Sequence, residues 1–277
     1  MPNVRLKLSN RPENVLLVRQ TLSGVGDAIG LDALELNDIS TAVSEACNNV
    51  AVHAYGGGLG PLEVEIDACA DALVVVVRDH GRGIHPEVKA SDESGGGIGL
   101  PVIRALTEDV EFTALDGGGT EVRMAFATAK AATLVRAGGE EREQPTAIVD
   151  DTLANTIAMT IAPTSLARTV LPRVMCALAA RAYFSTDRIS DTQTLADALV
   201  AHTDRSISAS HLSVGVSVAP RNLAVCVGPL PPGRASALVL DVDEDSLGPV
   251  IRRLIDHHEI SPDGSSEMLA LHLADPR

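Results

Sequence analysis

The sequence carries one series of segments twice, with a spacing of about 150 residues, and this repeat limits the folds open to the chain. Each copy has the same outline, in the same order, and ends in a DG turn and a final strand. The matching stretches are 5–22 with 158–174, 37–53 with 187–202, 62–79 with 211–228, and 99–112 with 247–260. A period this long predicts a tandem duplication of a whole domain rather than a short-repeat solenoid.

Within the first copy, hydrophobic periodicity predicts a mixture of strands and helices. Residues 4–8 alternate as a strand, and a helix is expected from near Pro12 to about Ile29. Residues 62–79 and 111–126 each predict an antiparallel hairpin, and a further helix is expected from Pro101. These elements indicate an α+β fold. The predicted domains are residues 1–130 and 151–277, joined by a polar linker at 131–150.

Composition excludes several classes of partner. The net charge of −15 and an aromatic content of 2% argue against direct nucleic-acid binding. No apolar run approaches the length of a membrane span, and residues 1–10 lack the apolar core of a signal peptide, so no membrane contact and a cytoplasmic location are expected. The four cysteines have no CxxC spacing and are expected to be reduced, buried thiols.

Residues 41–55 (TAVSEACNNVAVHAY) predict a helix with one unusual face. Val43 and Cys47 belong to its apolar side, whereas Glu45, Asn49 and His53 follow one another at four-residue intervals on the other. A solvated polar face is the ordinary explanation for such a ridge. The alternative is a functional site that uses an acid and an amide one helical turn apart.

Two glycine-rich stretches favour the functional reading. Residues 79–84 (DHGRGI) place a carboxylate at the end of a strand and glycines directly after it, where backbone can approach a ligand closely. Residues 94–100 (SGGGIGL) open into a helix, where free N–H groups can bind phosphate. The spacing fits neither a dinucleotide fingerprint nor a P-loop.

Taken in order, these motifs resemble those of the GHKL ATPases, and most closely the bacterial anti-sigma-factor serine kinases. The resemblance covers residues 4–128, where the order is ExxxN on a helix, DxGxG after a strand, GxGxG before a helix, and GGT at the last hairpin. It implies a two-layer α/β sandwich, the Bergerat ATP-binding fold, which the repeat predicts to be duplicated in tandem.

The resemblance also implies a role for each motif residue. Glu45 would be the general base, Asn49 would hold Mg²⁺ against the ATP phosphates, and Asp79 would accept a hydrogen bond from the adenine amino group. His53 would be a supporting group or merely the polar end of its helix. The remaining nucleotide contacts implied are Gly81, Gly83 and Ile84 at the adenine, Gly95, Gly97, Ile98, Gly99 and Leu100 in the lid over the phosphates, and Thr120 at the base edge.

The second copy lacks these residues. When Ile189 is aligned with Ile39, Leu195 and Leu199 occupy the positions of Glu45 and Asn49. An apolar pair cannot bind Mg-ATP, so a degenerate domain without a nucleotide site is predicted, with the leucines in its core. Asp197 and His202 are expected at its surface.

Two functions follow from the resemblance. The first is an ATP-dependent protein serine/threonine kinase that phosphorylates a STAS-type anti-anti-sigma protein, with a sigma factor as a further partner. The alternative is an ATP-binding regulatory module that sequesters a partner without phosphotransfer. Relatives of this kind act as homodimers, so the second copy is expected to replace a dimer partner in a monomeric pseudo-dimer, with a homodimer left open. A histidine kinase is disfavoured, because no helical hairpin with a phosphoacceptor histidine precedes the domain.

Overall fold

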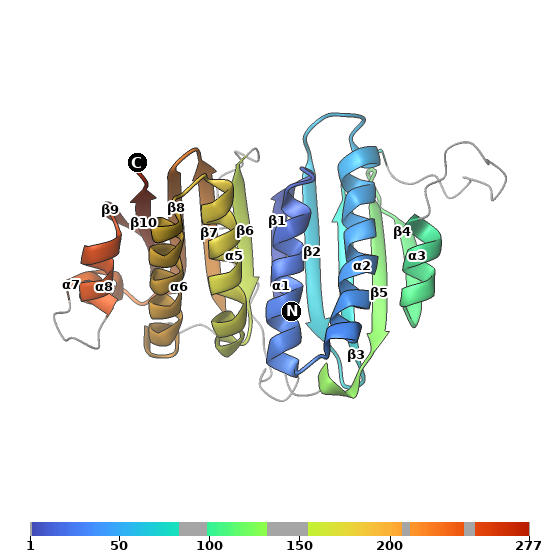
Figure 1. The fold of residues 1–277 in the computed structure, drawn as a ribbon, viewed down its shortest axis with the longest axis horizontal. Helices are drawn as coiled ribbons and strands as arrows, with labels where there is room; N and C mark the ends of the chain where they lie inside the picture. The colour runs from blue at the N-terminus through green and yellow to red at the C-terminus, as the bar shows by residue number, and fades with distance from the viewer. Residues whose placement is uncertain (1, 83–98, 132–154, 207–210, 241–246, 277) are drawn as a thin grey trace.

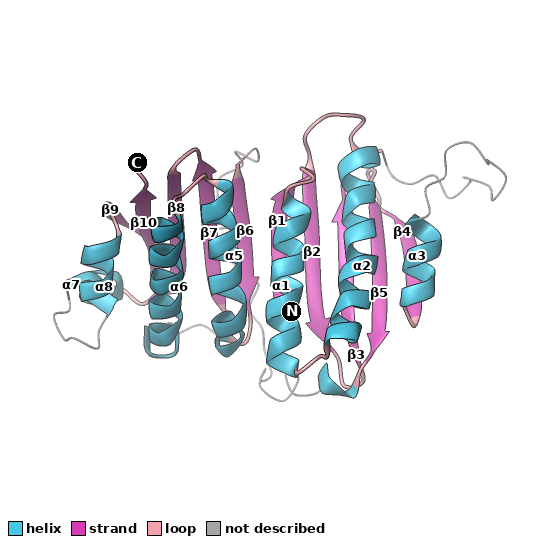
Figure 2. Cartoon of the chain, in the orientation of Figure 1, coloured by secondary structure: helices cyan, strands magenta, loops and turns pink. Residues whose placement is uncertain are grey.

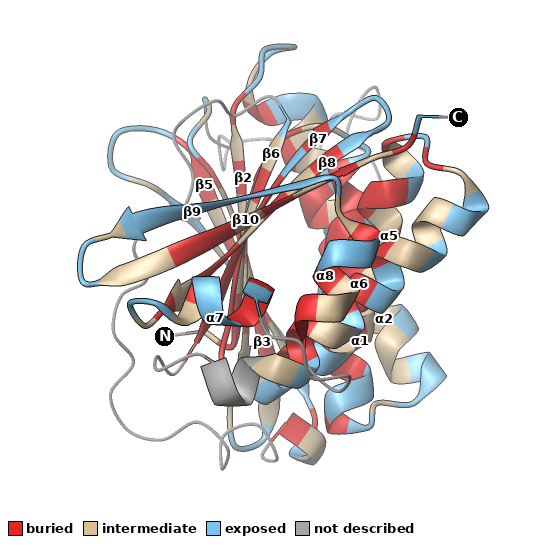
Figure 3. Ribbon diagram, turned by 90° about the vertical axis from the view of Figure 1, so that its left-hand side faces the viewer, coloured by how far each residue is buried: buried red, intermediate tan, exposed pale blue. Residues whose placement is uncertain are grey.

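The computed structural model describes residues 2–82, 99–131, 155–206, 211–240 and 247–276, with the backbone alone at 203–206. Ten strands form one antiparallel sheet, and the long helices lie side by side along one face of it (Figures 1 and 2). The buried residues gather between the sheet and the helices, as the side view in Figure 3 shows. The predicted α+β class and two-layer arrangement are confirmed.

The first half follows the order expected from its sequence. Its strands are β1 (Val4–Ser9), β2 (Pro61–Ala68), β3 (Ala72–Asp79), β4 (Asp109–Ala114) and β5 (Thr120–Ala127). Its helices are α1 (Asn14–Ile29), α2 (Ala33–Asn49) and α3 (Gly99–Leu106), with a π-helical turn η1 (Val50–Ala54) after α2 and a short 3₁₀ turn η2 (Ala129–Ala131) after β5.

Among the described residues, the second half repeats this order, with helix α7 at a place where residues 83–98 of the first half are not described. Its strands are β6 (Thr156–Ile161), β7 (Leu212–Ala219), β8 (Asn222–Leu230), β9 (His257–Asp263) and β10 (Ser266–Ala274). Its helices are α5 (Ala167–Arg181), α6 (Thr186–Ser206), α7 (Arg234–Leu240) and α8 (Leu247–Leu254), with a 3₁₀ turn η3 (Thr164–Leu166) before α5.

Strand alternation decides which face of the sheet is covered. In β2, Leu62, Val64 and Ile66 are fully buried, while the residues between them lie on the opposite face and are partly exposed. On that opposite face Glu65 pairs with Arg5 of β1 at 2.8 Å and with Arg78 of β3 at 3.0 Å. The apolar side of the strands therefore faces the helices, and the charged side is held together by ion pairs across neighbouring strands.

The two halves meet edge to edge. The strand order β4-β5-β3-β2-β1-β6-β7-β8-β10-β9 is the same when read outward in either direction from the β1–β6 pair. Arg5 lies opposite Thr160 in this antiparallel pairing, and the Asn3 side chain donates to the Ala162 carbonyl at 2.9 Å. The predicted repeat thus corresponds to two similar sets of elements in one continuous sheet; that they arose by duplication, and that they are separate domains, stays a prediction.

Helices extend this junction above the sheet. Helix α1 packs against α5, and Arg181 of α5 donates to the Asn14 side chain at 2.5 Å. Arg173 of α5 forms an ion pair with Asp27 near the other end of α1. The two helices approach closely at Gly24, where an added Cβ would lie 2.6 Å from the Thr169 carbonyl oxygen. The halves are therefore joined by β1–β6 backbone pairing in the sheet and by α1–α5 packing in the helix layer.

The cysteines are all unpaired, as expected, but only one is fully buried. Burial raises the pKa of the Cys47 thiol to about 12, whereas Cys69, Cys176 and Cys226 are only half-buried. The prediction of four buried thiols is therefore wrong for three of them.

Among the described residues, no helix has both the length and the apolar character that a membrane span requires.

Candidate functional site

Helix α2 carries the acid and the amide singled out from the sequence. It begins with a capping box, in which the Asp32 carboxylate accepts from the backbone N–H groups of Leu34 and Glu35, both at 2.9 Å. Toward its other end, Glu45 and Asn49 are half-buried, one turn apart, while Val43 and Cys47 on the opposite side are fully buried. The two polar side chains are therefore held on a fixed helix whose other face is in the core.

The start of α3 lies directly over this pair. A Cβ added to Gly99 would lie 2.9 Å from Glu45 Oε2 and 3.7 Å from both polar atoms of the Asn49 amide. Gly99 is itself buried, and a side chain at this position would require the Glu45 carboxylate to shift. The structure thus brings the predicted helix motif together with the last glycine of the predicted lid. Leu100, the next residue, is exposed.

Asp79 ends β3 in a buried position. Its side chain is 3% exposed, and Oδ1 accepts a hydrogen bond from the backbone N–H of Gly81 at 2.9 Å. In the sheet it lies opposite Leu62 on one side and Thr120 on the other, and Thr120 is equally buried. A carboxylate has about four lone-pair sites, so one backbone bond leaves most of its acceptor capacity open.

Two glycines allow the backbone to pass close to Asp79. A Cβ added to Gly81 would lie 2.1 Å from the Ala54 carbonyl oxygen, so the turn after β3 rests directly on the end of η1. Gly119 has a φ of +103°, and an added Cβ there would lie 2.1 Å from the Asp79 carbonyl oxygen. At both positions a side chain would clash with backbone, either at the end of η1 or at the Asp79 main-chain carbonyl.

The helix after Asn49 changes its geometry. Residues 50–54 form a π-helical turn, which has more residues per turn than an α-helix and appears often at functional sites. His53 lies within this turn and is exposed, whereas Glu45 and Asn49 are half-buried. It therefore lies at the polar end of the helix, one of the two roles expected for it.

Tyr55 organises this end of the site, although no sequence pattern marks it. Its hydroxyl donates to the Pro61 carbonyl at 2.5 Å and accepts from the His80 backbone N–H at 2.9 Å. Arg82 N–H also bonds to the Ala54 carbonyl, at 2.8 Å. Burial raises the pKa of Tyr55, so its hydroxyl remains a donor. Tyr55 thus fixes the turn that follows Asp79 against the end of η1.

Part of the predicted nucleotide site falls outside the described residues. These positions are Gly83, Ile84, Gly95, Gly97 and Ile98. The structure does describe the other predicted positions, which are Glu45, Asn49, Asp79, Gly81, Gly99, Leu100 and Thr120. Helix α2 carries Glu45 and Asn49, and it packs against β3 and β5, the strands that carry Asp79 and Thr120.

The equivalent helix of the second half is apolar at the aligned positions. Leu195 and Leu199 of α6 are buried, and Asp197 is exposed as expected. His202 is half-buried and lines a pocket, so its predicted surface placement is wrong.

Comparison with known proteins identifies the first half. Residues 8–126 match the family model of the histidine kinase-like ATPase domain. "Serine-protein kinase RsbW" from Bacillus pumilus (strain SAFR-032) is 33% identical over 129 residues, which cover 41% of this chain and 80% of that protein. The chain belongs to the RsbW family.

Further proteins are similar to part of the chain. "Serine-protein kinase RsbW" from Bacillus subtilis (strain 168) is 32% identical, over 39% of this chain and 75% of that protein. "Anti-sigma F factor" from Caldanaerobacter subterraneus subsp. tengcongensis is 28% identical, over 44% of this chain and 90% of that protein. Among solved structures, the histidine kinase domain of the Erythrobacter litoralis EL346 blue-light activated histidine kinase is 25% identical, with a TM-score of 0.30, over 39% of this chain and 50% of that one.

Proposed function

We propose that the first half of the chain binds ATP and transfers its γ-phosphoryl group to a serine or threonine of a small STAS-type anti-anti-sigma protein. The observation that carries the proposal is the meeting of Glu45, Asn49 and Gly99 at one place. The names of the relatives, serine-protein kinase and anti-sigma factor, support the same class of function.

The described residues fit an adenine nucleotide. Asp79 offers a buried carboxylate that can accept from an exocyclic amino group. Asn49 offers an amide oxygen, a hard ligand of the type that Mg²⁺ accepts together with phosphate oxygens and water. When bound there, Mg²⁺ would neutralise charge on the phosphates.

Glu45 is proposed as the proton acceptor. In the transfer, the hydroxyl oxygen of the partner forms a bond to the γ-phosphorus, and the bond from that phosphorus to the bridging oxygen of ADP breaks. The hydroxyl proton passes to the Glu45 carboxylate, which lies one helical turn from Asn49 and beside the start of α3. Both side chains would then act on one phosphoryl group.

The transfer itself can be measured with ATP labelled at the γ-phosphate. The full chain is incubated with this ATP, Mg²⁺ and purified STAS-type proteins, and label is expected on a serine or threonine of one of them. Nucleotide binding without any transfer would contradict the kinase proposal. It would favour the second candidate, an ATP-binding module that sequesters a sigma factor or other partner, for which the anti-sigma F relative is the supporting observation.

Asp79 provides a specific test of adenine recognition. The Asp79→Asn variant is expected to bind ATP about tenfold more weakly, because hydrogen bonds to a charged group contribute roughly 1.5 kcal/mol or more. Asp71→Asn is the matched control: Asp71 is exposed and immediately precedes β3 at its opposite end. Calorimetric titration with ATP should separate the two variants, and equal affinities would remove Asp79 from the proposed site.

The second half is proposed to take the place of a dimer partner. Strand β1 is already paired with β6 of the same chain, and α1 is already covered by α5. A second copy cannot pair with β1 in the same way without displacing β6. We therefore propose a monomeric pseudo-dimer with one nucleotide site.

A further inference from the structure

The hydroxyl group of Tyr55 lies between two segments of backbone close to Asp79. It donates to the Pro61 carbonyl at 2.5 Å and accepts from the His80 N–H at 2.9 Å. Because a carbonyl oxygen only accepts and an N–H only donates, both roles of the hydroxyl are fixed by its partners. Tyr55 therefore connects the first residue of β2 with the residue that directly follows Asp79.

The ring of Tyr55 is itself held in place by its neighbours. Gly60 is buried against the ring, and a Cβ added to it would lie 2.1 Å from the Tyr55 Cε1 atom. Asn10 holds Gly60 from the other side: its side-chain oxygen accepts from the Gly60 N–H, and its own N–H donates to the Gly60 carbonyl, both at 2.9 Å. The hydroxyl is thus presented by a fixed ring.

Three successive N–H groups in the turn after β3 are hydrogen-bonded. Their acceptors are, in chain order, the Tyr55 hydroxyl, Asp79 Oδ1 and the Ala54 carbonyl oxygen. The first and third bonds hold the turn to the end of η1, and the middle one holds the Asp79 carboxylate. Without the Tyr55 hydroxyl, only the bond to Ala54 would hold the turn, and the N–H of Gly81 that orients the carboxylate would be less well fixed.

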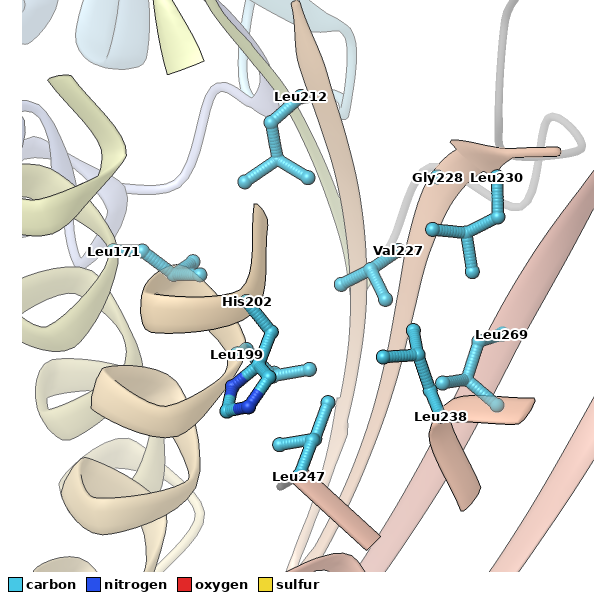
Figure 4. A pocket seen from close by; sticks show the side chains of 10 residues that line it. All are labelled: Leu171, Leu199, His202, Leu212, Val227, Gly228, Leu230, Leu238, Leu247 and Leu269. Carbon is cyan, nitrogen blue, oxygen red and sulfur yellow. The ribbon is translucent and has the colours of Figure 1, made fainter. Parts of the chain in front are cut away.

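The second half shows whether the fold itself needs this tyrosine. When residues 62–79 are aligned with 211–228, Gly228 stands at the position of Asp79, and Leu199 stands at that of Asn49; Figure 4 shows both among apolar neighbours. Residues 203–210 (TDRSISAS), between α6 and β7 and at the end of α6, contain neither a tyrosine nor a glycine. The same order of elements therefore forms without a counterpart of Tyr55 or Gly60, and the tyrosine is missing where the carboxylate is missing.

We propose that Tyr55 is a positioning residue for adenine recognition, and that its hydroxyl acts by holding the turn that orients Asp79. This rests on the proposed binding of ATP by the first half. It adds that the affinity for adenine depends on a hydroxyl group that acts through the carboxylate.

Tyr55→Phe tests the proposal, because it keeps the ring and removes only the hydroxyl. Calorimetric titration of the full chain with ATP and Mg²⁺ should show about fivefold weaker binding, the equivalent of one hydrogen bond. Tyr183→Phe is the matched control: Tyr183 is the second of the two tyrosines in the chain and is 76% exposed, so ATP affinity should not change.

Combining Tyr55→Phe with Asp79→Asn shows whether the tyrosine acts through the carboxylate. If the two effects were independent, they would multiply to about fiftyfold weaker binding. We expect the double variant to bind ATP within about twofold of Asp79→Asn alone, because the carboxylate that Tyr55 serves is already gone. Full multiplication of the two effects would overturn the proposal, since a general weakening of the fold would act in this way.

Amide hydrogen exchange without nucleotide gives a second readout. In Tyr55→Phe the Gly81 N–H should exchange about fivefold faster or more, while the N–H of Val64 in β2 should be unaffected. Unchanged exchange at Gly81 would overturn the proposal, as would faster exchange with undiminished ATP affinity. Neither result would touch the proposed kinase, which fails instead if the native chain takes up no ATP.

Discussion

Replacing Glu45 with glutamine is expected to slow phosphoryl transfer by about 10²–10⁴-fold, the contribution typical of a positioned general base. Glutamine has nearly the same size and shape, so the close contact with Gly99 is kept. Its amide, however, cannot take up the proton of the attacking hydroxyl. Affinity for ATP should stay near that of the native chain, because the proposed contact with the metal belongs to Asn49 and the proposed contact with adenine belongs to Asp79.

The measurement needs both readouts on the same protein. Single-turnover transfer from labelled ATP to a STAS-type protein gives the rate, and calorimetry gives the affinity. Glu111→Gln is the control for the charge change, since Glu111 is exposed on the outer strand β4. A Glu45→Gln protein that transfers phosphate at the native rate would show that the proton goes elsewhere. A protein that neither binds nor transfers would show that Glu45 shapes the nucleotide pocket instead.

Sequence patterns predicted those parts of the site that depend on local backbone geometry. The apolar spacing of residues 41–55 placed Glu45 and Asn49 on one helix, and a strand followed by glycine placed Asp79 and Gly81. Each of these signals acts over a few residues, where periodicity and turn chemistry are readable. Gly99 lies beside Glu45, as expected if the helix motif and the glycine-rich stretch belong to one site.

Features that depend on distant partners were not predictable in this way. Tyr55 bonds to Pro61 and His80, which are 6 and 25 residues away, and nothing in its own surroundings marks it. The π turn at 50–54 leaves no trace in a hydrophobic pattern that tolerates one extra residue. His202 is a different case, because it follows Leu195 and Leu199 at helical spacing, and this alone could have placed it on the inner face of α6.

The contact between the two halves was likewise not predictable from local sequence patterns. Alternation predicts that residues 4–8 are a strand, and the repeat matches 158–174 to 5–22, but neither pattern says that the two segments pair with each other. Gly24 likewise looks like an ordinary glycine within a helix, which would weaken that helix slightly. Its partner is the backbone of α5, almost 150 residues later, and only the packed structure reveals why a side chain is missing there.

Gly24→Ala is therefore expected to destabilise the whole chain, against the usual preference of helices for alanine. The new Cβ would lie 2.6 Å from the Thr169 carbonyl oxygen and 2.7 Å from Val170 Cα, and backbone atoms cannot rotate away. Overpacking of this kind costs typically 1–3 kcal/mol, occasionally more. Alanine recovers at most about 1 kcal/mol through helix propensity. Because the clash is with backbone, we expect an overpacking cost of about 3 kcal/mol, and the free energy of unfolding should therefore fall by about 2 kcal/mol.

Gly26→Ala in the same helix separates the two effects. Its Cβ would meet side-chain methyl groups instead, Leu36 Cδ1 at 3.1 Å and Leu31 Cδ1 at 3.4 Å, and these can shift. This variant should be as stable as the native chain or slightly more stable, through helix propensity. Urea unfolding measures the free energy of unfolding of both variants. Light scattering reports whether the mass of each stays at the 28.8 kDa of one chain. If the two variants were equally stable, α1 and α5 would not be in backbone contact, and the second half could not occupy the place of a dimer partner. A selective loss in Gly24→Ala, with the mass of a monomer, is the result that a pseudo-dimer built on this contact requires.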